Sequence, residues 1–127
     1  MRFVVFFIGE QQYGVEIGKL KLIAESSRTE QISPRLISVA GKTIPLCDLH
    51  SLLGTKPSIE SKSFFVVTSS DGEKAFAVDK INGLFYISAD NIKPCRPITE
   101  HSCRLISGIV QLENRTVLLL DTDMLNV

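Results

Sequence analysis

The sequence predicts an all-β protein made of two small five-stranded β-barrels that pack around a shared core, with short helical pieces. Three features predict this fold. Short runs of β-branched and aromatic residues are separated by turn residues, and the series of runs in the first half recurs in the second. Each half has about 50–60 residues of short strands, a size that closes into a small barrel and so removes exposed sheet edges.

The first half opens with a predicted β-hairpin. Residues 3–8 are dense in aromatic and β-branched side chains, as in a strand buried on both faces. Residues 9–12 form the turn, and residues 13–17 return with alternating apolar and polar positions.

Further short strands follow this hairpin. Residues 20–23 predict a third strand, and residues 26–33 are polar and predict a loop. Two strands, at 36–39 and 43–46, flank a turn at 40–42. Asp48 can then cap a short helix, because its carboxylate accepts the free N–H groups of a first helical turn.

The second half repeats this series. The predicted elements are strands at 64–67, 76–79, 84–87, 105–106, 109–110 and 116–120, with a turn at 69–72 and a last helical turn after Asp121. Arg35 to Ser38 recurs as Arg104 to Ser107, with identical letters. The whole chain, 1–127, is read as one domain, with residues 1–56 as the first barrel and 63–127 as the second.

Composition and charge narrow the class of protein. Of 127 residues, 44% are apolar and 22% charged, and 14 Lys and Arg balance 14 Asp and Glu. The chain is therefore expected to fold, and no overall field attracts nucleic acid or an anionic membrane. The apolar run 3–8 is too short for a signal-peptide core or a membrane span, so we expect a cytoplasmic protein without membrane insertion.

Several motifs resemble those of the CheW-like family of chemotaxis coupling proteins, across nearly the whole chain. In the first half they are residues 13–17, 44–49 and 52–54, and in the second half residues 77–83, 92–94, 106–108 and 117–121. The resemblance implies two SH3-like barrels without an active site or cofactor. It also implies an adaptor that joins the regulatory domain of a CheA-type histidine kinase and, as a second partner, the cytoplasmic tip of a chemoreceptor.

The resemblance also implies partner-binding positions. In the family, the turn before the helix meets the kinase's regulatory domain, and the matching residues here are Val39, Ala40 and Gly41. An apolar groove between the barrels receives the receptor tip, and Leu20 and Ile23 on the third strand are the candidates. The alternative is that Leu20, Ile23 and Val39 are core residues, since most apolar strand residues are buried.

One departure marks this chain as a diverged member. The family's Asn-Leu-Arg-Gly turn is replaced by residues 38–41, Ser-Val-Ala-Gly, so the arginine is absent. Ser38 to Thr43 also spans fewer positions than the repeated Ser107 to Thr116. The first-half hairpin is therefore predicted to be short.

Other chemistry has little support in the sequence. Cys47 is expected in the core and, with Asp48 and His50, is a poor candidate for catalysis. The three residues Cys95, His101 and Cys103 match no usual zinc spacing, so we expect no metal and no cofactor. The alternative function is a β-barrel nucleic-acid or small-ligand module, which would use a basic strip of Lys19, Lys21, Arg28 and Arg35.

Overall fold

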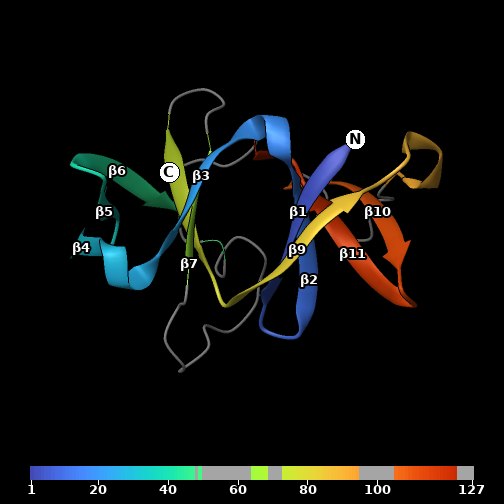
Figure 1. Ribbon diagram of the computed structural model, residues 1–127, viewed down its shortest axis with the longest axis horizontal. Helices are drawn as coiled ribbons and strands as arrows, with labels where there is room; N and C mark the ends of the chain where they lie inside the picture. The colour runs from blue at the N-terminus through green and yellow to red at the C-terminus, as the bar shows by residue number, and fades with distance from the viewer. Residues whose placement is uncertain (48, 50–63, 69–72, 95–104, 123–127) are drawn as a thin grey trace.

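The computed structural model describes residues 1–47, 49, 64–68, 73–94 and 105–122, and these residues form strands joined by short turns (Figure 1). The strands are β1 (Arg2–Ile8), β2 (Gln11–Glu16), β3 (Leu20–Glu25), β4 (Thr29–Ser33), β5 (Leu36–Val39), β6 (Lys42–Cys47), β7 (Phe64–Thr68), β8 (Lys74–Val78), β9 (Lys80–Tyr86), β10 (Ile106–Leu112) and β11 (Arg115–Leu120). Three 3-10 turns complete them: η1 (Ile17–Lys19), η2 (Ser26–Arg28) and η3 (Ala89–Asn91). The all-β prediction is confirmed. The helices predicted after Asp48 and Asp121 and the turn at 69–72 fall largely or wholly outside the described residues.

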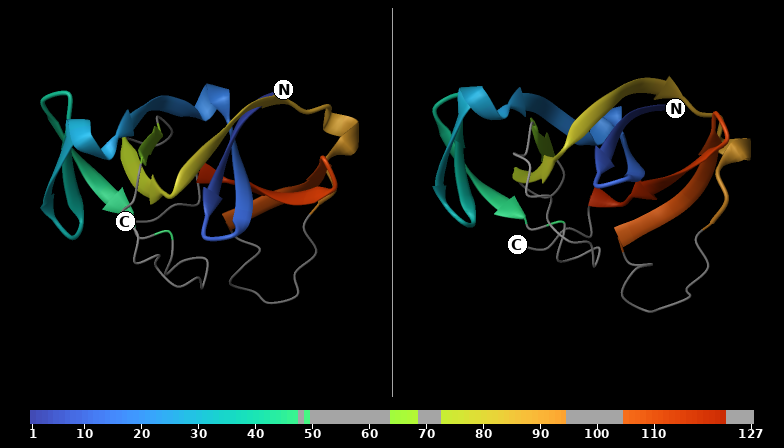
Figure 2. Two further views of the ribbon diagram at one scale, coloured as in Figure 1. Left: turned by 60° about the horizontal axis from the view of Figure 1, so that its bottom comes forward. Right: turned by 90° about the horizontal axis from the view of Figure 1, so that it is seen from below.

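Two sheets lie side by side as two lobes (Figures 1 and 2). One has the order β10-β11-β2-β1-β9 and the other β3-β7-β8-β6-β5-β4. Neighbouring strands are antiparallel except for β11 beside β2 and β6 beside β8, which are parallel. We call the first sheet the first barrel and the second sheet the second barrel.

Each barrel closes across a 3-10 turn. In the first barrel the chain passes from β9 through η3 to Lys93, which exchanges two backbone hydrogen bonds with Ile109 of β10, at 2.8 and 2.7 Å. In the second barrel the chain passes from β3 through η2 into β4, which pairs with β5. Each closure removes a free sheet edge.

The loop predicted at 26–33 is therefore wrong over Thr29–Ser33, which forms β4. Its three central residues are exposed, and none of its side chains is buried. Because this strand buries so little surface, its sequence shows no alternation of apolar and polar residues. Its backbone pairing with β5 holds it in place.

The assignment of residues 1–56 to one barrel and 63–127 to the other is also wrong. The first barrel combines the β1–β2 hairpin of the first half with β9, β10 and β11 of the second. The second barrel combines the β7–β8 hairpin with β3 to β6. The duplication itself is retained, since β1 pairs with β9 as β7 pairs with β3, and β2 lies beside β11 as β8 lies beside β6.

The short links between strands explain this exchange. Asp79 alone separates β8 from β9, whereas the commonest tight hairpins use two-residue loops. β9 therefore continues away from its own hairpin into the other barrel. The backbone N–H of Asp79 donates to the Phe7 carbonyl at 2.9 Å, and its carboxylate Oδ2 accepts the Gly9 N–H at 2.6 Å. This crossover is thus fixed to the β1–β2 hairpin.

The barrels share a core, as predicted. A central cluster contains buried side chains of both barrels: Phe6, Ile8, Tyr13, Val15, Cys47, Leu49, Val66, Phe76, Val78, Leu105, Ile106 and Leu120. At its centre the rings of Phe6 and Phe76, one from each N-terminal hairpin of the two halves, lie 5.5 Å apart between centroids. Smaller clusters fill each barrel, around Val5 and Val117 in the first and around Ile37 and Ile44 in the second.

Candidate docking surfaces

The positions predicted to bind partners divide into exposed and buried residues. Ile23 on β3 is 37% exposed, and Ala40 and Gly41 form an exposed turn. Val39, in contrast, is 5% exposed and belongs to the cluster inside the second barrel. Leu20 is half-buried and packs against the central cluster. The core alternative therefore describes Val39 and Leu20 better than it describes Ile23.

Three of the five positions line one open groove of about 570 Å³ on the second barrel. Its lining residues are Leu22, Ile23, Ala24, Glu25, Arg28, Val39 and Ala40, and we call it the second-barrel groove. Ile23 and Ala40 reach it from β3 and from the β5–β6 turn. Leu20 and Gly41 are not among its lining residues.

Local sequence explains how this groove forms. Side chains along β3 alternate between half-buried and exposed, so Leu22 and Ala24 pack on the second-barrel cluster while Ile23 and Glu25 face outward. Arg28 lies in η2, directly after the strand. The groove therefore has an apolar floor, an apolar exposed residue and one charge of each sign.

The turn at Ala40 has an unusual backbone. Both of its central residues have positive φ, 50° at Ala40 and 80° at Gly41, as in the two-residue type I′ turns favoured in hairpins. The repeated turn in the first barrel has the same form, with φ of 51° at Glu113 and 65° at Asn114. The first-half hairpin is shorter, as predicted, with four registered pairs against six.

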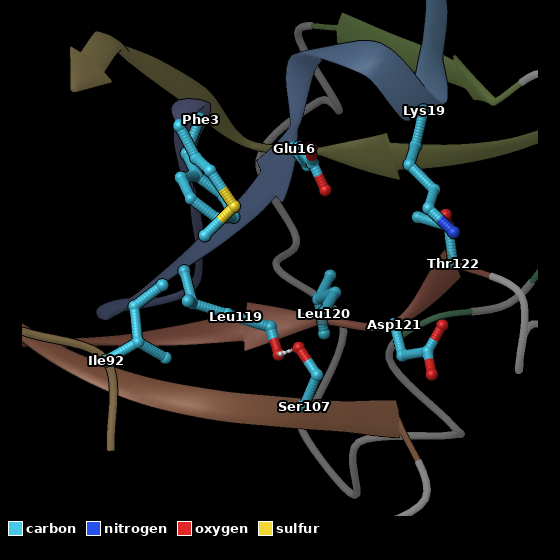
Figure 3. A pocket seen from close by; sticks show the side chains of 10 residues that line it. Phe3, Glu16, Lys19, Ile92, Ser107, Leu119, Leu120, Asp121 and Thr122 are labelled. Carbon is cyan, nitrogen blue, oxygen red and sulfur yellow. Dashed lines mark hydrogen bonds between the residues drawn. The ribbon is translucent and has the colours of Figure 1, made fainter. Parts of the chain in front are cut away.

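A second hollow, of about 300 Å³, lies at one end of the first barrel (Figure 3). Apolar side chains, among them Phe3, Ile92 and Leu119, line one part of it. Glu16 and Lys19 line another part, beside the crossover from β2 to β3. The sequence did not reveal this hollow, because its lining comes from several segments that no local motif connects.

The predicted basic strip does not form one surface. Lys21 bonds to Glu73, and the Lys42 Nζ lies 3.6 Å from the same carboxylate oxygen. The hydrogen bond that Lys21 donates to Glu73 lowers the pKa of Glu73, and the same bond raises the pKa of Lys21. Lys19 lines the hollow of the first barrel, whereas Arg28 lines the groove of the second. The charge needed for a nucleic-acid track is therefore divided and partly neutralised.

Thiol and metal chemistry gains no support from the described part of the chain. Cys47 is 4% exposed within the central cluster, which confirms its predicted core position. Asp48, His50, Cys95, His101 and Cys103 lie outside the described residues. Within the ranges that are described, no three His, Cys, Asp or Glu side chains gather as metal ligands. No helix in those ranges is long and apolar enough to span a bilayer.

The chain thus forms two barrels around a shared core, with hollows on both barrels. Residues 2–126 match the family profile described as the CheW-like domain, and the chain belongs to that family. Its structure is similar to that of the scaffolding protein TtCheW from Thermoanaerobacter tengcongensis, with a TM-score of 0.80. The two are 23% identical over 94% of this chain and 88% of that chain. No curated protein matches the sequence.

Proposed function

We propose that this chain is a non-catalytic, cytoplasmic scaffold of chemotaxis-type signalling that couples a CheA-type histidine kinase to chemoreceptors. Membership of the CheW-like family supports the scaffold role. The observation that carries the docking assignment is the convergence of Ile23 and Ala40. The resemblance assigns Ala40 to the turn that meets the kinase and Ile23 to the groove for the receptor tip, and in this chain both residues are exposed and line one groove.

We assign the second-barrel groove to the kinase's regulatory domain, because it contains the turn that the resemblance gives to the kinase, and Ile23 then belongs to this contact and not to the receptor groove. Interfaces draw most of their binding energy from a few apolar or aromatic anchors that become fully desolvated, and rim charges contribute less. Ile23 is the large exposed apolar side chain among the lining residues, and Leu22 and Ala24 form a floor that packs on the barrel core. Glu25 and Arg28 are placed to orient a partner.

Replacing Ala40 with glutamate should weaken kinase binding without unfolding the protein. The turn is exposed, and glutamate already occupies the repeated position, Glu113, at almost the same φ. At an interface the new carboxylate would lose water without gaining a partner, so we expect at least a roughly tenfold loss of affinity, about 1.4 kcal/mol. Calorimetric titration with the purified regulatory domain of the cognate kinase measures the affinity, and a thermal melt measures stability.

Ala40→Asn is the matched control, because asparagine is neutral and accepts positive φ readily. It should retain both affinity and melting temperature. A folded Ala40→Glu protein that binds the regulatory domain as tightly as the parent would show that this turn lies outside the kinase interface. Unfolding by Ala40→Glu, with Ala40→Asn intact, would place position 40 in the core.

A further inference from the structure

A partly exposed carboxylate links two strands at the edge of the second-barrel groove. Glu73 lies directly before β8, and its Oε1 accepts a hydrogen bond from the Lys21 Nζ of β3. The Nζ of Lys42, the first residue of β6, lies 3.6 Å from the same oxygen. One carboxylate therefore holds two lysines that come from different strands.

The backbone register places this cluster beside the groove. Lys42 is the cross-strand partner of Val39, and the side chains of such a pair lie on the same face of a sheet. Lys21 directly precedes Leu22 on β3. Val39 and Leu22 both line the groove and pack in the apolar cluster inside the second barrel. The two lysines thus adjoin its two walls, which are β3 on one side and the end of β5 with the β5–β6 turn on the other.

Backbone pairing does not join these two walls directly. Among the described strands, β3 pairs with β7, whereas β5 pairs with β4 and β6. The chain itself connects the walls at the far end of β3, where η2 leads into β4 (Figure 1). Lys21 lies near the start of β3, so Glu73 connects the walls at the opposite end of the strand.

This connection acts on local geometry more than on overall stability. An exposed ion pair adds little to the free energy of unfolding, but a network of several charges can hold its members in one arrangement. The hydrogen bond from Lys21 lowers the pKa of Glu73, so the carboxylate stays charged well below neutral pH. Both lysines therefore keep a charged partner across the range in which the protein would work.

We infer that Glu73 is a positioning residue, which holds the β5–β6 turn near β3 and thereby sets the shape of the second-barrel groove. The inference rests on the proposed function, since it concerns how this groove receives the kinase's regulatory domain. A groove already held in its binding shape loses less conformational freedom when the partner binds. Glu73 acts in this way without touching the partner.

Backbone dynamics of the full-length, ¹⁵N-labelled protein without its partner test the connection itself. In the parent, the order parameters of Gly41 and Lys42 should be near about 0.85, as in rigid backbone, and in Glu73→Gln they should fall toward about 0.6. The melting temperature should stay close to that of the parent, because exposed ion pairs contribute little to stability. Glu113→Gln removes an exposed carboxylate of the first barrel and is the matched control, which should leave both measurements unchanged.

Kinase affinity then separates a positioning role from a direct charge contact. Titration with the purified regulatory domain of the cognate kinase should show roughly two- to tenfold weaker binding for Glu73→Gln and for Lys42→Gln alike. Both substitutions break the connection between the walls, so both act in the same direction. If these side chains instead contacted charges of the partner, removing a negative and a positive charge would change the affinity in opposite directions.

Two results would overturn the inference: unchanged order parameters at Gly41 and Lys42 in the Glu73→Gln protein, and opposite affinity changes in the two single variants. Ala40→Glu, measured in parallel, tests the proposed function separately. If Ala40→Glu weakens kinase binding and neither Glu73→Gln nor Lys42→Gln does, the inference fails and the proposed function stands. If none of the three weakens binding but the turn becomes mobile in Glu73→Gln, the kinase contact fails and the role of Glu73 in shaping the groove stands.

Discussion

Phe76→Ala should destabilise the protein by about 3–5 kcal/mol, the usual cost of removing a large buried aromatic side chain. Phe76 is fully buried in the central cluster, with its ring against that of Phe6 from the other hairpin. The void would open between the barrels, so both should be weakened together. Urea unfolding followed by far-UV circular dichroism and tyrosine fluorescence should show one coincident transition at a lower midpoint.

Leu84→Ala is the matched control, since it also truncates a large apolar side chain on a strand. Leu84 is 54% exposed, so its loss should change the free energy of unfolding by less than about 0.5 kcal/mol. Two separate transitions in the Phe76→Ala protein, or a loss under about 1 kcal/mol, would contradict a core shared by the two barrels.

Local composition was sufficient to predict most of the strands. The run from Phe3 to Ile8 is buried at every position except Phe7, as its aromatic and β-branched residues indicate. The return strand was predicted at 13–17 and forms at Gln11–Glu16, so the predicted turn was too long, and the third strand was predicted at 20–23 and forms at Leu20–Glu25. These predictions succeed because the side chains of each strand carry the signal of their own burial. The strand at Thr29–Ser33 carries none and was missed.

Which barrel each strand joins depends on the connections between strands. An alignment of the two repeats does not take these connections into account. A duplicated sequence is equally compatible with two separate barrels and with two exchanged ones, because either arrangement pairs the same kinds of strand. β9 crosses over after the single residue Asp79, which leaves too little chain for a hairpin, and β3 crosses over after the three residues of η1. That signal is present in the sequence once both strand boundaries are known, and boundaries are the least certain part of such predictions.

Sequence alone also could not separate the exposed candidate docking residues from the buried ones. Ala40 and Gly41 were predicted at a turn, and turn residues are exposed almost by necessity. Ile23 and Val39 are both apolar strand residues, yet one is 37% exposed and the other 5%. Which face of a strand is covered depends on what packs there, and β3 packs on the hairpin of the other half. A polar hollow near the β10–β11 turn, lined by Phe7, Gln12, Lys80 and Arg115 among others, could not be predicted from the sequence, because residues of five strands and a turn form it.

The duplication also has a consequence for binding. After duplication, the two equivalent sites beside the type I′ turns can change independently, because each is built from different residues of one chain. In the second barrel this site now has Val39 and Ala40, whereas in the first it has Leu112 and Glu113. The two barrels therefore have unlike surfaces beside equivalent turns, and the shared core holds the barrels together.

Gly108→Ala should destabilise the first barrel by about 1–3 kcal/mol, the usual cost of forcing an extra carbon into a packed site. A Cβ at position 108 would lie 2.6 Å from Ile92 Cγ2 and 3.2 Å from the Lys93 carbonyl oxygen. Ile92 is β-branched, so its Cγ2 can move only by rotation about χ1, and such side chains have few favourable χ1 rotamers. The backbone of Ile92 leads into the Lys93–Ile109 bridge that closes the barrel. Amide exchange at Lys93 and Ile109 should therefore accelerate along with the loss of global stability.

Gly18→Ala is the control for the Gly108 substitution, because a Cβ at position 18 meets no atom within 4 Å. It should leave the free energy of unfolding within about 0.5 kcal/mol of the parent. The Gly108→Ala/Ile92→Ala double variant removes the clashing Cγ2 atom, so the two changes should cost less together than the sum of their separate costs. Strict additivity, or unchanged exchange at Lys93 and Ile109 in the Gly108→Ala protein, would show that the closure tolerates a side chain at this position.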